Sequence, residues 1–254
     1  GRHMLNALPW PETVLVCLSV LAAGFLRGLT GFGFALAAVP AMSFFLPPSQ
    51  AVAMAVLLQS LAGLKDSVTL RGTWDGPILK RMVAGAVVGT PFGVALLLVL
   101  DPTVTRLAIA ALILVGLAML MWKPRAGFGP PSMPLAMVAG LVAGLFGGFA
   151  AMPGPPAVAY FLTTDTPAIR TRASLIIFFF ATSLLALPGL IWGGVVTGPS
   201  VVMALIALPL MLLGTWAGGR AFARTSESGF RRMAMLVLLA TAIASGLRGL
   251  AGLV

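Results

Sequence analysis

Two glycine- and proline-rich stretches interrupt the long apolar runs of this chain, and its chemistry is expected there. The first covers residues 27–33 and reads Arg-Gly-Leu-Thr-Gly-Phe-Gly, with Pro40 further along. The second covers residues 144–148, and Met-Pro-Gly-Pro-Pro follows it at residues 152–156. Proline removes a backbone donor and glycine adopts unusual dihedral angles, so a helix is expected to break at each stretch. A helix that restarts after a break directs free N–H groups and the positive end of its dipole into the gap, which favours an anion.

Arg27 adds a full positive charge beside the first break, whereas Ala143 stands at the matching place before the second. An arginine at membrane depth costs about 2.5–3.5 kcal/mol on insertion scales and usually has a function. Its guanidinium fork suits a sulfite, sulfonate or carboxylate group. Two alternatives stay open: Arg27 can snorkel to the membrane interface, and glycines spaced by three or four residues can simply let helices pack closely.

The candidate substrate-binding residues come from both breaks and from polar side chains inside the apolar runs. Each of these polar side chains is also typical of a hydrogen bond between helices. The breaks, however, occur as a pair at corresponding positions, and such a pair indicates a transport site. The candidates are Arg27, Gly28, Thr30, Gly31, Gly33, Gln59, Gly147, Gly148, Pro153, Gly154, Pro156, Tyr160 and Thr182.

Side chains for enzymatic or metal chemistry are scarce. The single histidine, His3, lies within residues 1–4, which look like a tag scar, and Cys17 is the single cysteine. We therefore expect no metal, no cofactor and no enzyme activity. The carboxylates lie near the ends of apolar runs, so a relay of buried carboxylates is not expected. Asp66 is interpreted as a solvated interfacial pair with its neighbour Lys65.

The elements that must position the breaks are transmembrane helices. The composition is 59% hydrophobic and 9% charged. As one straight helix, residues 12–46 would span about 50 Å, against about 30 Å of hydrocarbon, so this run must break or turn back. The sequence predicts an all-α, polytopic integral membrane protein with eight to ten transmembrane segments, some of them short or broken.

The net charge of +10 comes from basic residues in the connections. This pattern indicates the positive-inside rule and no nucleic-acid partner. Three basic connections, at residues 65–81, 123–125 and 220–232, are assigned to the cytoplasm. The connections at residues 101–102 and 193–199 are not basic and are assigned to the outside. Arg170 and Arg172 indicate a cytoplasmic start for the run that follows them.

The chain contains an internal repeat at an offset of 116 positions. Residues 23–46 match residues 139–162 at 10 of 24 positions, where about two or three matches would arise by chance. Equivalent connections differ in charge: the basic one precedes the Gly-Thr helix in the first unit and follows it in the second. Two inverted-topology repeats of about five segments each are therefore predicted. Their bounds are residues 5–122 and 133–254, joined by a linker at residues 123–132.

The spacing of Gly28, Gly31 and Gly33, the stretch from Gly147 to Pro156 with Tyr160-Phe161 after it, and the duplicated unit together resemble the sulfite exporter TauE/SafE family. This resemblance covers nearly the whole chain. It implies a multi-pass permease of the bacterial cell inner membrane for sulfite, for organosulfonates such as sulfoacetate, or for other small organic anions.

Residues and resemblance together predict a membrane transporter that exports small anions by alternating access around a midplane site at the two broken helices. An anion channel and an intramembrane enzyme are the alternatives. The expected partners are a small anionic substrate and the lipid bilayer, and the chain is a monomer or a homodimer. Neither the anion nor the coupling ion, H⁺, Na⁺ or none, follows from the residues.

Overall fold

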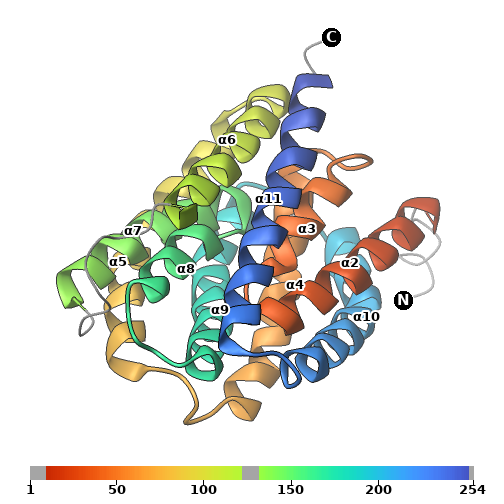
Figure 1. Cartoon of the computed structure of the whole chain (residues 1–254). Coiled ribbons are helices and arrows are strands. Elements are labelled where there is room, and N and C mark those ends of the chain that lie inside the picture. The colour runs from red at the N-terminus through yellow and green to blue at the C-terminus, as the bar shows by residue number, and fades with distance from the viewer. Residues whose placement is uncertain (1–9, 122–131, 252–254) are drawn as a thin grey trace.

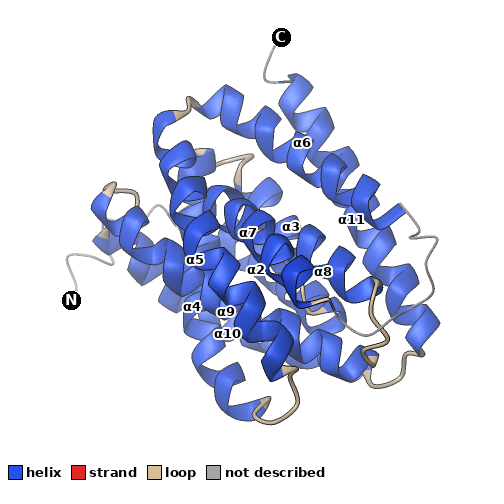
Figure 2. Cartoon of the chain, turned by 90° about the vertical axis from the view of Figure 1, so that its left-hand side faces the viewer, coloured by secondary structure: helices blue, strands red, loops and turns tan. Residues whose placement is uncertain are grey.

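A computed structural model describes residues 10–121 and 132–251. Over these residues the chain forms helices joined by short connections and no strand (Figures 1 and 2). Six of the helices are long and apolar enough to cross a membrane, and Gly33–Met42 and Pro102–Val115 are shorter apolar helices. The prediction of an all-α polytopic membrane protein is confirmed. The helices are α2 (Trp10–Thr30), α3 (Gly33–Met42), α4 (Pro48–Thr69), α5 (Gly76–Val99), α6 (Pro102–Met121), α7 (Met133–Ala150), α8 (Gly154–Leu162), α9 (Ala168–Trp192), α10 (Gly198–Phe222) and α11 (Glu227–Ala251).

Polar caps and prolines set where several of these helices begin. The side chain of Asp75 accepts a hydrogen bond from the N–H of Ile78 and starts α5, and Ser132 caps α7 through the N–H of Leu135. Thr197 forms a capping box at the start of α10. Such caps satisfy backbone donors that the first helical turn leaves free, so the helix starts are fixed locally by the sequence.

The helices form two sets with the same internal arrangement. α2 packs against α10 just as α7 packs against α5, while α4 contacts α9 and α6 contacts α11 (Figure 1). Pairing α2 with α7, α3 with α8, α4 with α9, α5 with α10 and α6 with α11 exchanges one set for the other. The two predicted repeats are therefore related by a pseudo-twofold axis, and each repeat places a helix against the other repeat.

Glycines bring the helices of these pairs into backbone contact. A Cβ atom added to Gly24 would lie 2.7 Å from the carbonyl oxygen of Met211, and one added to Gly28 would collide with the carbonyl oxygen of Thr215. The contacting residue number rises by four on both helices from one contact to the next, so α2 and α10 run parallel. In the same way Gly85, Gly89 and Gly93 of α5 face successive turns of α7, so α5 and α7 are also parallel. The two helices of each pair can approach so closely because glycine has no side chain.

The two repeats run in opposite directions through the membrane. Arg27 on the last turn of α2 contacts Asp66 of α4 and Thr215 of α10, so the C-terminal ends of these three helices lie together. We call this the basic end, because the connections at residues 65–81 and 220–232 leave from it. α5 begins there and α7 runs parallel to α5, so α7 points away from the basic end while α2 points toward it. This arrangement agrees with the predicted inverted repeats.

The positive-inside rule assigns the basic end to the cytoplasm. The opposite end carries a pocket of about 340 Å³ lined by Glu12 of α2, Ser49 of α4 and Thr197 before α10, where these three helices begin. The basic connection at residues 123–125, most of the predicted linker and the tag scar at residues 1–4 lie outside the described residues. The bounds of the repeats stay a prediction.

Candidate functional site

The first break separates α2 from α3 and is closed by one threonine. Gly31 has a φ of +83°, a left-handed conformation that favours glycine. The Thr30 hydroxyl donates to the carbonyl of Leu26 over 2.7 Å and accepts from the N–H of Gly33 over 3.1 Å and from that of Phe32 over 3.4 Å. Thr30, which is fully buried, thus supplies an oxygen to the first N–H groups of α3, where an anion was expected.

The second break lies about one turn later in its repeat than the first. Gly147 and Gly148 are still inside α7, which ends in a left-handed residue, Ala151, with a φ of +58°. The Gln59 amide donates from Nε2 to the carbonyl of Ala151 over 3.2 Å. α8 then begins at Gly154, and because two prolines follow, this glycine carries the one N–H among the first three residues of α8.

The two breaks meet inside the protein. A Cβ atom added to Gly154, at the start of α8, would lie 3.2 Å from the Cβ of Phe32, which sits between α2 and α3. The same atom would lie 3.1 Å from the ring of Phe179 on α9. Phe32 is fully buried and Phe179 is 1% exposed, so aromatic rings fill the meeting point. Gln59, on the middle turns of α4, and Thr182 of α9, against Gly147, both lie beside the second break.

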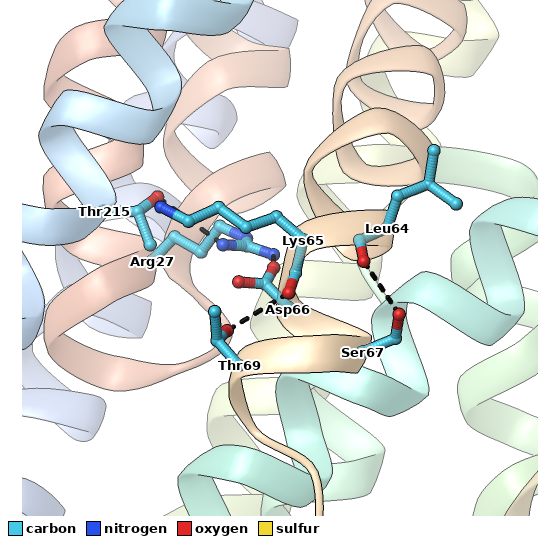
Figure 3. Close-up of polar contacts among 7 residues, drawn as sticks. All are labelled: Arg27, Leu64, Lys65, Asp66, Ser67, Thr69 and Thr215. Atoms are coloured by element: carbon cyan, nitrogen blue, oxygen red, sulfur yellow. Dashed lines mark hydrogen bonds and ion pairs between the residues drawn. The ribbon is translucent and has the colours of Figure 1, made fainter.

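Arg27 is buried at the basic end and held in an ion pair. Its side chain is 2% exposed, and Nη2 pairs with the Asp66 carboxylate, whose side chain is 11% exposed. Nη1 also donates to the Thr215 hydroxyl over 3.5 Å (Figure 3). The interpretation of Asp66 as a solvated pair with Lys65 is wrong, since Asp66 is buried on α4 and Lys65 is exposed. The sequence predicts that Lys65 and Asp66 lie near the end of a helix, but it does not show that the end of α2, with Arg27, lies beside Asp66.

Arg172 belongs to the same cluster, and sequence reasoning used it only for orientation. Its Nε donates to the carbonyl of Gly28 over 2.8 Å, and its guanidinium stacks 5.0 Å above the ring of Phe222. Gly31 also packs closely against Arg172, since a Cβ atom added to Gly31 would lie 3.1 Å from Arg172 Cγ. Its position in the first turns of an otherwise apolar helix was the signal that could have identified it.

The candidate residues therefore fall into two groups, with three outliers. Arg27, Gly28 and Gly31 gather at the basic end, whereas the junction of the breaks holds Thr30, Gly33, Gln59, Gly147, Pro153, Gly154 and Thr182. Gly148 packs against the backbone of Thr90 on α5, and Pro156 is buried in the first turn of α8. The Tyr160 hydroxyl turns away from the junction and donates to the carbonyl of Ser132 at the start of α7.

Several buried polar atoms of α4 and α5 lack a partner among the described residues. They are Gln59 Oε1, Ser60 Oγ and Thr90 Oγ1. Buried polar groups are normally satisfied, so unpaired oxygens at membrane depth indicate positions where water or a solute can bind. The described residues contain no group of three or more histidine, cysteine, aspartate or glutamate side chains that could hold a metal ion.

Comparisons with known proteins agree with this architecture. The family model described as "Sulfite exporter TauE/SafE" matches residues 16–245. A protein of Cupriavidus necator named "Probable sulfite/organosulfonate exporter TauE" is 30% identical over 235 residues, which cover 87% of this chain and 89% of the relative. No solved structure matches the chain.

Proposed function

This chain belongs to the sulfite exporter TauE/SafE family of membrane transporters, and we propose that it exports sulfite or an organosulfonate such as sulfoacetate across a bacterial inner membrane. The name of the Cupriavidus necator relative supports this substrate class. The cationic cluster at the basic end supports an anion, because two arginines there face one carboxylate.

The proposed mechanism is alternating access around the junction of the two breaks. The observation that carries it is the contact of Phe32 with Gly154, since interrupted helices of two inverted repeats then converge on one point. Inverted repeats are suited to exchanging a state open at one end for a state open at the other. In this conformation the Phe32 and Phe179 rings close the junction, and rocking of one repeat against the other would part them.

At the junction the anion would be held by neutral donors. The Gln59 amide, the Thr182 hydroxyl and the N–H of Gly154 lie around it. In this conformation Gln59 donates to the carbonyl of Ala151 and Thr182 donates to the carbonyl of Phe179, and both would turn to the anion when the junction opens. Neutral donors bind an oxyanion without trapping it, which a transport cycle requires. The membrane potential, negative inside, drives an anion outward by about 2.3 kcal/mol per charge per 100 mV, so export needs no further coupling ion.

Flux into proteoliposomes tests this function. Purified protein should give saturable uptake of labelled sulfite, and sulfoacetate should compete with it more strongly than sulfate, taurine or acetate. Single-channel currents in a planar bilayer would favour the alternative of a channel. The absence of flux for every sulfur anion, from protein that remains folded, would reject the proposal. A thermal-shift screen with the same anions identifies the ligand independently, because a ligand of the native state raises Tm by mass action.

A further inference from the structure

A pocket of about 350 Å³ opens beside the Arg27–Asp66 ion pair, between α4, α9 and α10. Arg172 and Asp66 line it, and so do Thr215, Lys65 and Arg220. It is separate from the junction of the breaks, since none of its lining residues belongs to α3, α7 or α8. The pocket belongs to the basic end, the side from which an exporter must load.

The charges around this pocket do not balance. Arg27, which is buried, and Arg172, which is half-buried, carry two positive charges, and the Asp66 carboxylate supplies one negative charge. Lys65 and Arg220 add further positive charge, with Arg220 stacked 4.7 Å above the ring of Trp216. Removing a charge from water is costly unless the charge is paired, so an anionic group that enters the pocket would balance the half-buried charge of Arg172.

The geometry leaves the guanidinium of Arg172 available to such a group. Its Nε is occupied by the carbonyl of Gly28 and its plane is held by Phe222. Its Nη2 lies beside Gly219, where an added Cβ would be only 3.2 Å away. The glycine therefore keeps the space next to Nη2 open, and an arginine fork fixed in this way is suited to two oxygens of one acid group.

The opposite end lacks this arrangement. The repeat offset of 116 places Ala143 where Arg27 stands. α4 and α9 are matched by the prolines that precede them, Pro47 and Pro167, which are 120 positions apart. The same offset places Ala186 of α9 where Asp66 stands on α4. The pocket at that end has Glu12 and no lysine or arginine among its described lining residues. The pocket at the basic end is therefore the one that attracts an anion.

We propose that the pocket at the basic end is a loading site for one acid group of the transported anion. Arg172 receives a sulfonate, sulfite or carboxylate group, and Asp66 is a resident carboxylate that competes with it for Arg27. When the anion takes Arg27, the ion pair between α2 and α4 opens and the path toward the junction is released. This inference rests on the proposed transport function and adds a second, cytoplasm-facing site to it.

Sided transport kinetics test the loading site. Uptake of labelled sulfite is measured in inside-out membrane vesicles, with the basic end facing the medium, and in right-side-out vesicles. In inside-out vesicles Arg172→Gln should raise KM about tenfold, since a charge-assisted hydrogen bond is lost. Arg172→Lys should recover only part of this loss, because it keeps the charge without the fork. In right-side-out vesicles both variants should keep KM within about twofold of the wild type.

Asp66→Asn should change binding in the opposite direction. With its competitor neutralised, Arg27 is free for the anion, so KM in inside-out vesicles should fall several-fold. A damaged protein would not bind more tightly, so this variant separates a binding role from a structural one. Arg71→Gln is the matched control, because Arg71 is an exposed cation on the same side that does not line the pocket. It should leave KM unchanged.

The outcomes distinguish this inference from the function on which it rests. Wild-type vesicles that fail to transport sulfite or methanesulfonate would reject the function itself. Saturable wild-type transport with an unchanged KM in Arg172→Gln would overturn the loading site and leave the function standing. Equal KM changes from both faces would also overturn it, because a cytoplasmic site predicts an effect on one side. If Arg172→Gln does not fold, a wild-type or raised KM in Asp66→Asn would decide against the site.

Discussion

Replacing Arg27 by methionine should destabilise the protein by about 3–5 kcal/mol, because the Asp66 carboxylate is then left buried without its partner. The two side chains are 2% and 11% exposed, so water screens the remaining charge only weakly. Methionine has a similar length and fills irregular gaps, so the loss reports mainly the unpaired charge. Arg27→Ala would leave the same carboxylate without its partner. The ion pair makes that single variant an unsafe test of binding.

The double variant Arg27→Met/Asp66→Leu separates the charge from the packing. Replacing a whole buried ion pair by apolar side chains is often neutral or stabilising. We therefore expect the double variant to recover most of the stability that either single variant loses. Unfolding is followed by circular dichroism in mixed micelles with increasing SDS, and the four proteins form a double-mutant cycle.

Two results would refute this reasoning. Single-variant losses below about 0.5 kcal/mol would mean that the side chains are solvated, as exposed pairs are. Losses that simply add in the double variant would mean that Arg27 and Asp66 are not coupled. Sulfite should in addition raise the Tm of Asp66→Asn more than that of the wild type, because the anion then supplies the missing charge.

Further substitutions test the breaks and the helix contacts. Gly31→Val should lower the free energy of unfolding by about 1–2 kcal/mol, since valine resists a φ of +83°, and chemical denaturation measures it. Gly218→Ala should force α2 and α10 apart and cost about 1–3 kcal/mol, whereas Gly76→Ala, which meets open space, should match the wild type. Pro156→Ala adds an N–H to the first turn of α8 and should therefore change sulfite flux, and wild-type flux would leave the proline a packing role. Gln59→Leu should reduce flux and cost about 1 kcal/mol from the lost hydrogen bond, and a wild-type turnover rate would exclude this amide from the path.

Much of the fold could be predicted because the membrane limits the possibilities. Long apolar runs must be helices, since backbone polar groups in lipid need internal partners. The glycines of the repeat carried further information: Gly24 and Gly28, like Gly89 and Gly93, are the positions where parallel helices touch. Their spacing of four residues predicts a contact face, but it does not name the partner helix. That partner became clear only from the three-dimensional arrangement.

The cluster at the basic end could not be predicted for the same reason. Arg27, Asp66 and Arg172 are far apart in sequence, and each stands near the end of an apolar run, where a charge is normally solvated. Burial of Asp66 depends on α2 and α10 covering the last turn of α4. Thr30 illustrates a second limit. Its type suited an anion ligand, yet its hydroxyl is engaged by the backbone of its own break.

The inverted repeats also explain where a direction of transport must be encoded. A pseudo-twofold axis makes the two ends equivalent in backbone, so the fold alone favours neither loading nor release at either end. Only side chains that differ between the repeats can make the ends unequal. Arg27 against Ala143 and Asp66 against Ala186 are such differences, while Thr215 and Thr90 occupy matching places on α10 and α5. On the proposed function, the residues at which the repeat fails are therefore the ones that would set the side from which an anion is taken up.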